Sequence, residues 1–258
     1  MSRIFITGSA DGLGLMAARL LIEDGHSVTL HGRTAARADE ALRLAPGAVD
    51  ALAGDLAEIA STRALADRAN ADGPFDAVIH NAGVGSREGR RIVTTDGLSH
   101  VFQINVLAPY LLTALMERPK RLVYLSSGLH RSGSPAVDDL QWENRPWNGL
   151  QAYSDSKLFD VLLAFGVARR WTDVRSNAVA PGWVATKMGG PGASDDLDQG
   201  PRTQVWLAAN TSRAADVTGG YFYHLAPAET HEAAHAPTAS NALFTACERI
   251  SGTAFPAV

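Results

Sequence analysis

The sequence predicts a single α/β domain: a doubly wound parallel sheet with helices on both faces. Seven short runs of β-branched or apolar residues are continuous rather than alternating, which is typical of strands buried on both faces. Longer segments with apolar residues at three- and four-residue spacing separate them, as crossover helices would. With 258 residues, 46% of them hydrophobic and 19% charged, the chain can bury one such core.

The expected elements alternate along the chain, and right-handed crossovers would join the strands. Strands are expected at residues 3–7, 27–31, 50–54, 77–80, 121–126, 176–180 and 220–224. Helices are expected at residues 13–24, 35–44, 59–71, 98–116 and 153–171. No Pro/Gly/Ser-rich linker, internal repeat or low-complexity tract divides the sequence, so we treat residues 1–258 as one cofactor-binding and catalytic domain.

Composition and charge narrow the classes of partner and compartment. The net charge is −4 and the basic residues are scattered, whereas a nucleic-acid surface needs a clustered basic face. The single Cys247 allows no internal disulfide, suits a reducing compartment and is expected to be a small buried apolar residue. The sequence shows no secretory signal pattern and no run long enough to span a bilayer. We therefore expect a soluble cytoplasmic protein with neither nucleic-acid nor membrane partners.

A glycine-rich turn follows the first expected strand and opens the first expected helix. Its spacing is Gly-x-x-x-Gly-x-Gly, a wider turn than Gly-x-Gly-x-x-Gly. Glycines allow close approach of a ligand, and a helix N-terminus offers free N–H groups and a positive dipole end, which suits a dinucleotide pyrophosphate. The alternative is an ordinary glycine turn. The candidate cofactor residues here are Gly8, Ser9, Asp11, Gly12, Leu13 and Gly14.

The end of the second expected strand bears on the choice between NADP and NAD. An acidic residue there would bind the ribose hydroxyls of NAD, but Gly32, Arg33 and Thr34 occupy the position. A guanidinium can form paired hydrogen bonds with a 2′-phosphate, so Arg33 favours NADP. Asp11 in the glycine turn opposes this, because its negative charge would repel a phosphate. The sequence predicts NADP as the cofactor, with NAD as the weaker alternative.

Two further strand ends carry candidate cofactor residues. Asp55 and Leu56 follow the third strand, where the carboxylate could bind the adenine or, alternatively, cap the helix that begins near Ile59. The fourth strand ends in Asn81, Ala82 and Gly83, and such small residues would let a cofactor lie against the backbone.

A candidate acid–base pair opens the last expected helix, where Tyr153 and Lys157 lie four residues apart in Tyr-Ser-Asp-Ser-Lys. That spacing places both side chains on one helix face. A fixed cation favours the ionised form of a nearby phenol, so the pair could transfer a proton at neutral pH. The alternative is a surface tyrosine beside a solvated lysine.

The ordered set of motifs resembles the classical short-chain dehydrogenase/reductase family over nearly the whole chain. The matching positions are Thr7 to Gly14, Asp55, Asn81-Ala82-Gly83, Asn105, Ser126-Ser127, Tyr153 with Lys157, and Pro181-Gly182. The Tyr-Ser-Asp-Ser-Lys segment and a His soon after the serine pair (His130) resemble the retinol-dehydrogenase-like branch, without the membrane anchor of its animal members.

The resemblance implies a Rossmann-type fold and a role for each matching residue. Tyr153 would be the catalytic acid or base, and Lys157 would favour its ionised form and bind the nicotinamide ribose. Ser127 would orient the substrate oxygen, with Ser126 as the other candidate. Asn105 would hold a water that links Lys157 to solvent. Residues beside the nicotinamide would be Pro181, Gly182, Val184 and Thr186.

Two segments outside the motifs could shape a substrate site. The interval from Ser127 to Tyr153 is longer than the family's usual one, and residues 129–150 could form a pocket wall or a solvated surface loop. Residues 186–201 are rich in Gly and Pro and could form a lid that brings Trp183 and Met188 toward the substrate. Apolar surface on the helices at 98–116 and 153–171, including Leu107, Leu111, Leu162 and Phe165, predicts a homodimer or homotetramer.

Two other patterns are expected to be coincidental. His231-Glu232-Ala233-Ala234-His235 matches a zinc-protease motif, but Pro227 and Pro237 bracket a segment too short for the required buried helix, so no metal site is expected. The sequon at Asn210 would meet no glycosylation machinery without a signal peptide.

The sequence leads to one function and two alternatives. We expect an NADP(H)-dependent oxidoreductase that interconverts a ketone or aldehyde with an alcohol, because hydride transfer belongs to the cofactor and the tyrosine supplies the proton. One alternative is a non-catalytic NADP-binding redox sensor, which would be expected to lack part of the Asn, Ser, Tyr and Lys set. The other is an isomerase or dehydratase that uses the same tyrosine, usually with a larger C-terminal domain.

Overall fold

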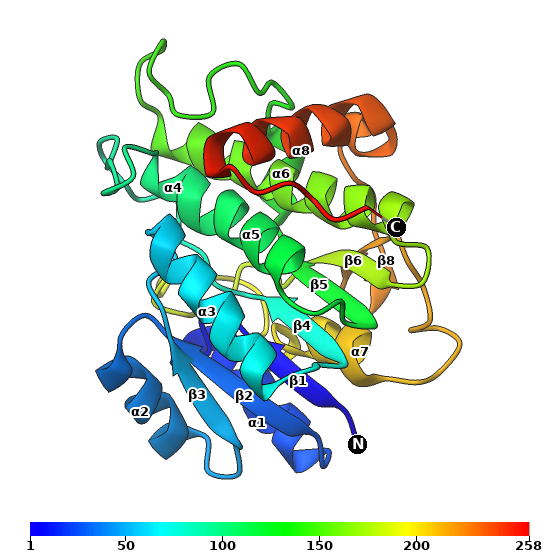
Figure 1. The fold of residues 1–258 in the computed structure, drawn as a ribbon. Coiled ribbons are helices and arrows are strands. Elements are labelled where there is room, and N and C mark those ends of the chain that lie inside the picture. Colours follow the sequence, from blue (N-terminus) through cyan, green and yellow to red (C-terminus); the bar gives the residue numbers. More distant parts are fainter. Residues whose placement is uncertain (258) are drawn as a thin grey trace.

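Eight strands form one sheet in the computed structural model of the protein, which describes residues 1–257 (Figure 1). The strand order is β3-β2-β1-β4-β5-β6-β7-β8. The strands are β1 (Arg3–Ile6), β2 (Ser27–Gly32), β3 (Asp50–Ala53), β4 (Ala77–His80), β5 (Arg121–Leu125), β6 (Arg175–Ala180), β7 (Tyr221–Tyr223) and β8 (Ala226–Pro227). The seven expected strands are confirmed to within a residue or two at each end. These seven strands, β1 to β7, pair in parallel. The sequence did not predict β8, which pairs antiparallel with β7.

Helices cover both faces of the sheet. On one face α1 (Gly12–Glu23), α2 (Ala35–Leu44) and α7 (Arg202–Ala209) share an apolar core with the strands. On the other face lie α3 (Ile59–Asp72), α5 (Ala108–Leu115) and α6 (Gly149–Arg170), with α8 (Pro237–Ser251) packed outside α5 and α6. The predicted fold class, a doubly wound sheet covered on both sides, is confirmed.

The expected helix at 98–116 is divided into three parts. A short α4 (His100–Phe102) leads into a π-helical turn, η1 (Gln103–Leu107), and α5 follows. Single π turns occur at functional sites more often than elsewhere, and this one contains the candidate residue Asn105. The described chain also has three 3₁₀ turns: η2 (Gly128–Ser132), η3 (Leu197–Gln199) and η4 (Glu232–His235).

The sequence did not predict α7 or α8. For α8 the start and stop signals are present in the sequence: Pro237 occupies its first turn, and Gly252 ends it with a positive φ of 67°. The helix buries Leu243, Phe244 and Cys247. Cys247 is fully buried, as expected from its apolar character.

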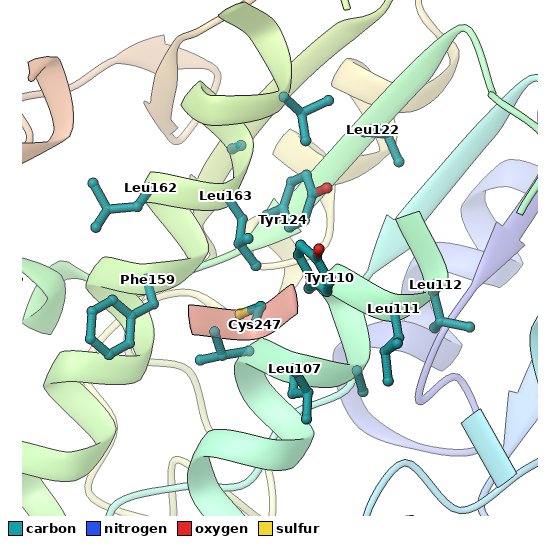
Figure 2. Packing of buried hydrophobic residues seen from close by; sticks show 14 of the residues in the cluster. Leu107, Tyr110, Leu111, Leu112, Leu122, Tyr124, Phe159, Leu162, Leu163 and Cys247 are labelled. Carbon is teal, nitrogen blue, oxygen red and sulfur yellow. The ribbon is translucent and has the colours of Figure 1, made fainter. Parts of the chain in front are cut away.

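The helix α8 covers the surface that was expected to form an oligomer interface. In Figure 1 α8 (red) lies across α6 and α5, and Figure 2 shows Cys247 of α8 facing the cluster that includes Leu107 and Leu162. Leu107, Leu111 and Leu162 are at most 1% exposed and Phe165 is 5% exposed within the single chain. The apolar surface on which the oligomer prediction was based is therefore already covered, and the oligomeric state itself stays untested.

Strand connectivity creates one crevice at the carboxyl edge of the sheet. The chain leaves β1 toward β2 on one side and returns to β4 on the other, so the direction of winding reverses beside β1. In doubly wound sheets, ligands bind where the strand order reverses, outside the carboxyl ends of the strands.

Candidate active site

A groove of about 510 Å³ lies at this carboxyl edge. It collects most of the candidate residues from seven separate stretches of the chain. Its lining includes Gly8, Asp11, Gly12, Leu13, Arg33, Asp55, Leu56, Asn81, Ala82, Gly83, Ser126, Tyr153, Lys157, Pro181 and Thr186. It also includes residues that the sequence analysis did not assign to the cofactor: His31, Gly54, Ile104, Leu125, Lys187 and Met188.

The glycine turn packs closely against the end of β4. Gly8 has a φ of +63°, and a Cβ at this position would lie 2.8 Å from the Cα of Ala82. The Asn81 side-chain amide donates to the carbonyl oxygens of Thr7 and Gly8 at 2.9 and 3.0 Å. No side chain caps the N-terminus of α1, so its first N–H groups stay available to an anion at the groove.

His31 is a site residue that sequence reasoning missed. Its Nδ1 accepts a hydrogen bond from the Gly8 N–H at 2.9 Å, so its Nε2 carries the proton and donates to the Gly54 carbonyl oxygen at 2.8 Å. Burial lowers the pKa of His31 to about 4, which keeps the ring neutral. The position of His31 at the carboxyl end of the second strand, where cofactor residues were expected, could have identified it as a site residue.

Ser9 serves the turn rather than the groove. It is fully buried, its Oγ donates to the Ile6 carbonyl oxygen at 2.9 Å, and the same Oγ accepts from the His31 backbone N–H at 2.8 Å. Ser9 is absent from the residues that line the groove. Its role within residues 1–257 is therefore to hold the glycine turn against β2.

The charge of Asp11 is compensated within the chain. Its Oδ2 accepts from Arg37 Nη2 at 2.8 Å and from Lys187 Nζ at 2.9 Å. Arg33 lines the groove, while Thr34 caps α2 by accepting from the Arg37 backbone N–H. The sequence predicted an uncompensated negative charge at Asp11, but the carboxylate lies between two cations. Arg37 follows Arg33 by four residues in the sequence, and this proximity could have indicated a basic cluster.

Asp55 lies in the groove lining and does not cap α3. Its Oδ1 accepts from the Ala57 N–H at 2.9 Å, whereas Glu58 occupies the position before α3 without a side-chain cap. Asp96, which is distant in sequence, accepts from the Ile59 N–H at 2.7 Å instead. The helix-cap alternative for Asp55 is therefore wrong.

Tyr153 and Lys157 both face the groove from α6, so the surface-pair alternative is wrong. The helix begins at Gly149, four residues earlier than expected, because the Asn148 side chain accepts from the Gln151 N–H. Lys157 Nζ lies 5.7 Å from the centre of the Tyr153 ring. Burial disfavours the ammonium, but nearby negative charge, above all Asp160, outweighs this effect and raises the pKa of Lys157.

The two serines after β5 have different environments. Ser126 is buried and lines the groove, and its Oγ donates to the Lys157 carbonyl oxygen at 2.7 Å. Ser127 is partly exposed and does not line the described groove; its Oγ accepts from the Leu129 N–H at 3.3 Å. Ser127 can therefore still donate its hydroxyl hydrogen to a ligand, whereas Ser126 already donates its hydroxyl hydrogen to the backbone of α6.

Asn105 joins three parts of the site. Its Oδ1 accepts from the Val84 N–H at 2.8 Å, and its Nδ2 donates to the Val84 carbonyl oxygen at 3.1 Å and to Ser156 Oγ at 2.9 Å. The side chain thus fixes the backbone just after Gly83 and connects it to α6.

Residues 181–201 lie beside the groove. Pro181, Thr186 and Met188 contribute to its lining, whereas Val184 is buried and pairs with Asp195 in an isolated bridge. Gly182 has a φ of +90° and, like Val184, is not part of the lining. Trp183 is 56% exposed, and Met188 is 45% exposed. Neither side chain is covered in this arrangement.

Residues 129–150 do not line the groove described here, and the segment combines buried with exposed residues. Leu140 and Trp142 are buried, and Arg145 lies 3.6 Å from the centre of the Trp142 ring while pairing with Asp139 and Asp155. Through these contacts, part of the segment packs against the first turns of α6.

The zinc-protease-like segment forms a 3₁₀ turn, not a helix. His231 Nδ1 accepts from the Ala233 N–H, and His235 Nε2 pairs with the Thr230 hydroxyl. Residues 1–257 contain no group of three or more His, Cys, Asp or Glu side chains arranged to hold a metal. None of the described helices is long and apolar enough to cross a membrane.

Comparison with known proteins agrees with this geometry. Residues 2–130 match the family model described as short chain dehydrogenase. An uncharacterized oxidoreductase of Emericella nidulans is 42% identical over 260 residues, covering 99% of both chains. The protein named "Putative daunorubicin C-13 ketoreductase DnrU" of Streptomyces sp. (strain C5) is 34% identical and covers 85% of this chain and 82% of its own.

Two further comparisons extend the likeness. Human retinol dehydrogenase 13 is 29% identical, covering 99% of this chain and 86% of its own. The crystal structure of an uncharacterized protein from Mycobacterium paratuberculosis superimposes with a TM-score of 0.86 at 28% identity, covering 99% of this chain and 95% of that one. The expected family is therefore confirmed: the chain belongs to the short-chain dehydrogenase family of oxidoreductases.

Proposed function

We propose that the protein is an NADP(H)-dependent oxidoreductase that interconverts a ketone or aldehyde with an alcohol. The observation that carries the proposal is that one groove contains the glycine turn, Arg33, Tyr153 and Lys157. A dinucleotide site and a proton-transfer pair are the two parts that this chemistry needs. The 34% identical relative named as a ketoreductase supports a carbonyl substrate.

The groove fits a nicotinamide dinucleotide. A Cβ at Gly8 would meet Ala82, and one at Gly14 would lie 2.4 Å from Asn81 Nδ2, so both positions need glycine to keep the turn tight. The free N–H groups of α1 would hold the pyrophosphate, and Asp55 and Leu56 would lie against the adenine. Gly83, Pro181 and Thr186 would lie beside the nicotinamide. When bound, the cofactor supplies or accepts the hydride.

The residues of α6 and β5 would handle the proton. Tyr153 would donate its phenolic proton to the carbonyl oxygen during reduction and take it back during oxidation. Lys157 would stabilise the phenolate by its charge and bind the ribose hydroxyls. Ser127 would hydrogen-bond the substrate oxygen, and its hydroxyl hydrogen is available for this because Oγ only accepts in the Leu129 contact. Asn105 holds the backbone beside Lys157 in place and would contribute to the proton path.

The preference for NADP follows from the basic residues around the end of β2. Arg33 lines the groove, and the pairing of Asp11 with Arg37 and Lys187 reduces the repulsion that a 2′-phosphate would otherwise meet. We propose NADP as the cofactor and NAD as the weaker alternative.

The substrate end would be shaped by residues 186–201. Trp183 and Met188 are exposed large apolar side chains, of which Met188 lines the groove, and closure of this segment would place both against the substrate. Residues 129–150 would support the site from outside by packing on α6.

A screen of ketones, aldehydes and alcohols that follows NADPH absorbance tests the proposal. Turnover of at least one carbonyl or alcohol is expected, and Tyr153→Phe should remove it. Tight NADPH binding without turnover of any compound would instead favour the redox-sensor alternative. Turnover without a net change in NADPH would favour an isomerase or dehydratase.

A further inference from the structure

A buried carboxylate lies next to the candidate catalytic lysine. Asp160 Oδ2 accepts from Lys157 Nζ at 2.7 Å, and the side chains are 3% and 7% exposed. Both belong to α6, three residues apart, so the helix itself sets their separation. Asp160 was not among the predicted site residues, and it does not line the groove.

The contacts of Lys157 leave one of its N–H groups for the groove. An ammonium has three donors. One N–H binds Asp160 and a second binds the Leu125 carbonyl oxygen at 2.8 Å. Lys157 nevertheless lines the groove, and a Cβ at Gly83 would lie 3.6 Å from its Nζ. The protein contacts therefore fix two donors and orient the third toward the groove, where the nicotinamide ribose would lie.

The surroundings of the pair are otherwise uncharged. On the side of β5, Tyr124 hydrogen-bonds Thr113 at 2.7 Å, and burial raises the pKa of this phenol, so it stays neutral. The His80 ring of β4 packs against Tyr124 in a tilted arrangement with ring centres 4.7 Å apart, and burial lowers the pKa of His80 to about 3. The titratable groups that face Asp160 are thus Lys157 on its own helix and neutral Tyr124 across the core.

A buried ammonium without a counterion would lose its proton readily, because burial disfavours the charged form. Asp160 supplies the counterion. Burial raises the pKa of Asp160, whereas the attraction of the Lys157 ammonium at 2.7 Å opposes this shift and favours the ionised carboxylate. The pair is then held as two charges, and Lys157 keeps its positive charge at the edge of the groove.

We propose that Asp160 is a positioning residue of the catalytic pair: it holds the Lys157 ammonium in place and keeps it charged while Tyr153 transfers the proton. This inference rests on the proposed function, since it assigns a role within the same site. Asp160 acts through Lys157 and does not touch substrate or cofactor.

The first test compares pH profiles of carbonyl reduction for the wild type and Asp160→Asn. Asn keeps the size and one acceptor oxygen but removes the negative charge. Without that charge, Lys157 loses its proton more easily, so the alkaline limb of kcat/KM should shift to lower pH by about one unit or more. Activity should recover as the pH is lowered. A uniform loss of activity with an unmoved alkaline limb would overturn the proposal.

Asp155→Asn is the matched control. Asp155 is also a buried carboxylate on α6, but its partners are Arg145, Gln151 and the Ser134 N–H, and none of them touches Lys157. This variant should keep the alkaline limb of the wild type. An equal shift in both variants would show that any charge loss on α6 has this effect, and it would also overturn the proposal.

The second test needs no activity and is therefore independent of the proposed function. Urea unfolding at pH 7.5 should show that Asp160→Asn destabilises the wild type but stabilises Lys157→Met, in which the carboxylate would be buried without a partner. Additive effects would contradict the coupling. If Asp160→Asn alone does not fold, the double variant Lys157→Met/Asp160→Asn should still fold. Failure of both variants to fold would overturn the proposal, because Asp160 would then be required for another reason.

The two proposals can fail separately. If the wild type reduces no carbonyl but the coupling between the two residues is measured, the proposed function is wrong and the role of Asp160 in the ion pair is supported.

Discussion

The Gly8 backbone N–H and the His31 Nδ1 form a hydrogen bond of 2.9 Å that ties the glycine turn to the end of β2. The opposite ring nitrogen donates to the Gly54 carbonyl oxygen at the end of β3. One neutral imidazole thus connects the ends of three neighbouring segments at the proposed cofactor site. Protonation of Nδ1 would remove the acceptor, so the geometry of the turn depends on His31 being neutral.

Stability should fall in mild acid because of His31. Its pKa in the folded protein, about 4, lies below the ordinary value of 6.5, so its contribution is present above pH 6.5 and is lost as the pH falls toward 4. Roughly 2 kcal/mol of unfolding free energy should disappear between pH 7.5 and 5. Urea unfolding of His31→Asn, which can keep the Gly8 acceptor but cannot titrate, should show a smaller decline over this range. His26→Asn, at the other end of β2, should decline as the wild type does.

Replacing Tyr153 by Phe should abolish turnover and leave NADPH affinity nearly unchanged, because the phenolic proton is removed and little else. The expected loss in kcat is about 10² to 10⁴. Tyr110→Phe is a suitable control, since this hydroxyl donates to the Thr253 carbonyl oxygen away from the groove. Near-normal kcat of Tyr153→Phe on the best substrate would refute the assignment of the catalytic tyrosine.

Arg33→Ala should weaken NADPH binding by roughly ten- to a hundredfold and spare NADH, because a charge-assisted contact with the 2′-phosphate contributes about 1.5 to 3 kcal/mol. Isothermal titration with both cofactors measures this directly. Arg43→Ala, an exposed arginine at the far end of α2, should change neither affinity. Equal binding of NADH and NADPH by the unmutated protein would remove the proposed role of Arg33.

Asp11→Asn should tighten NADPH binding more than NADH binding. The substitution releases Arg37 and Lys187 from their shared carboxylate, and both cations then become available to the 2′-phosphate. The gain should be about 1 kcal/mol or less at physiological salt, since these side chains are solvent-accessible, and it should shrink as salt is added. A weaker affinity for NADPH in this variant would show that Asp11 organises the site instead of opposing the phosphate.

Phe244→Ala should destabilise the fold by about 3 to 5 kcal/mol, because this ring is buried between α5, α6 and the end of the chain. A Cβ at Gly166 would lie 2.6 Å from the Phe244 ring, so α6 and α8 approach closely there. Urea unfolding measures this loss of stability, with exposed Thr238→Ala on the same helix as the control.

The packing of α8 also limits where an oligomer could form. If sedimentation shows a dimer or tetramer, its interface has to use a surface other than the one that α8 covers.

The sequence by itself determined the order of strands and helices, the parallel sheet and the family. Short apolar runs such as the one at 77–80 are typical of strands buried on both faces, and the glycine turn and the Tyr153 to Lys157 spacing are likewise local patterns that can be recognised in the sequence. Local hydrogen bonding and side-chain periodicity act over a few residues, which is why these features could be read directly.

The tertiary structure decided what depends on contacts between distant segments. Asp11 meets Lys187 across 176 positions of the sequence, His31 reaches Gly8 and Gly54 from a neighbouring strand, and Asp96 caps a helix that begins 37 residues earlier. The packing of α8 on α5 and α6 converted an expected oligomer surface into core. These pairings form only when the whole chain folds, and they determine which charges are compensated and which apolar surfaces are buried. Because the paired residues are far apart in the sequence, no local pattern could predict the pairings.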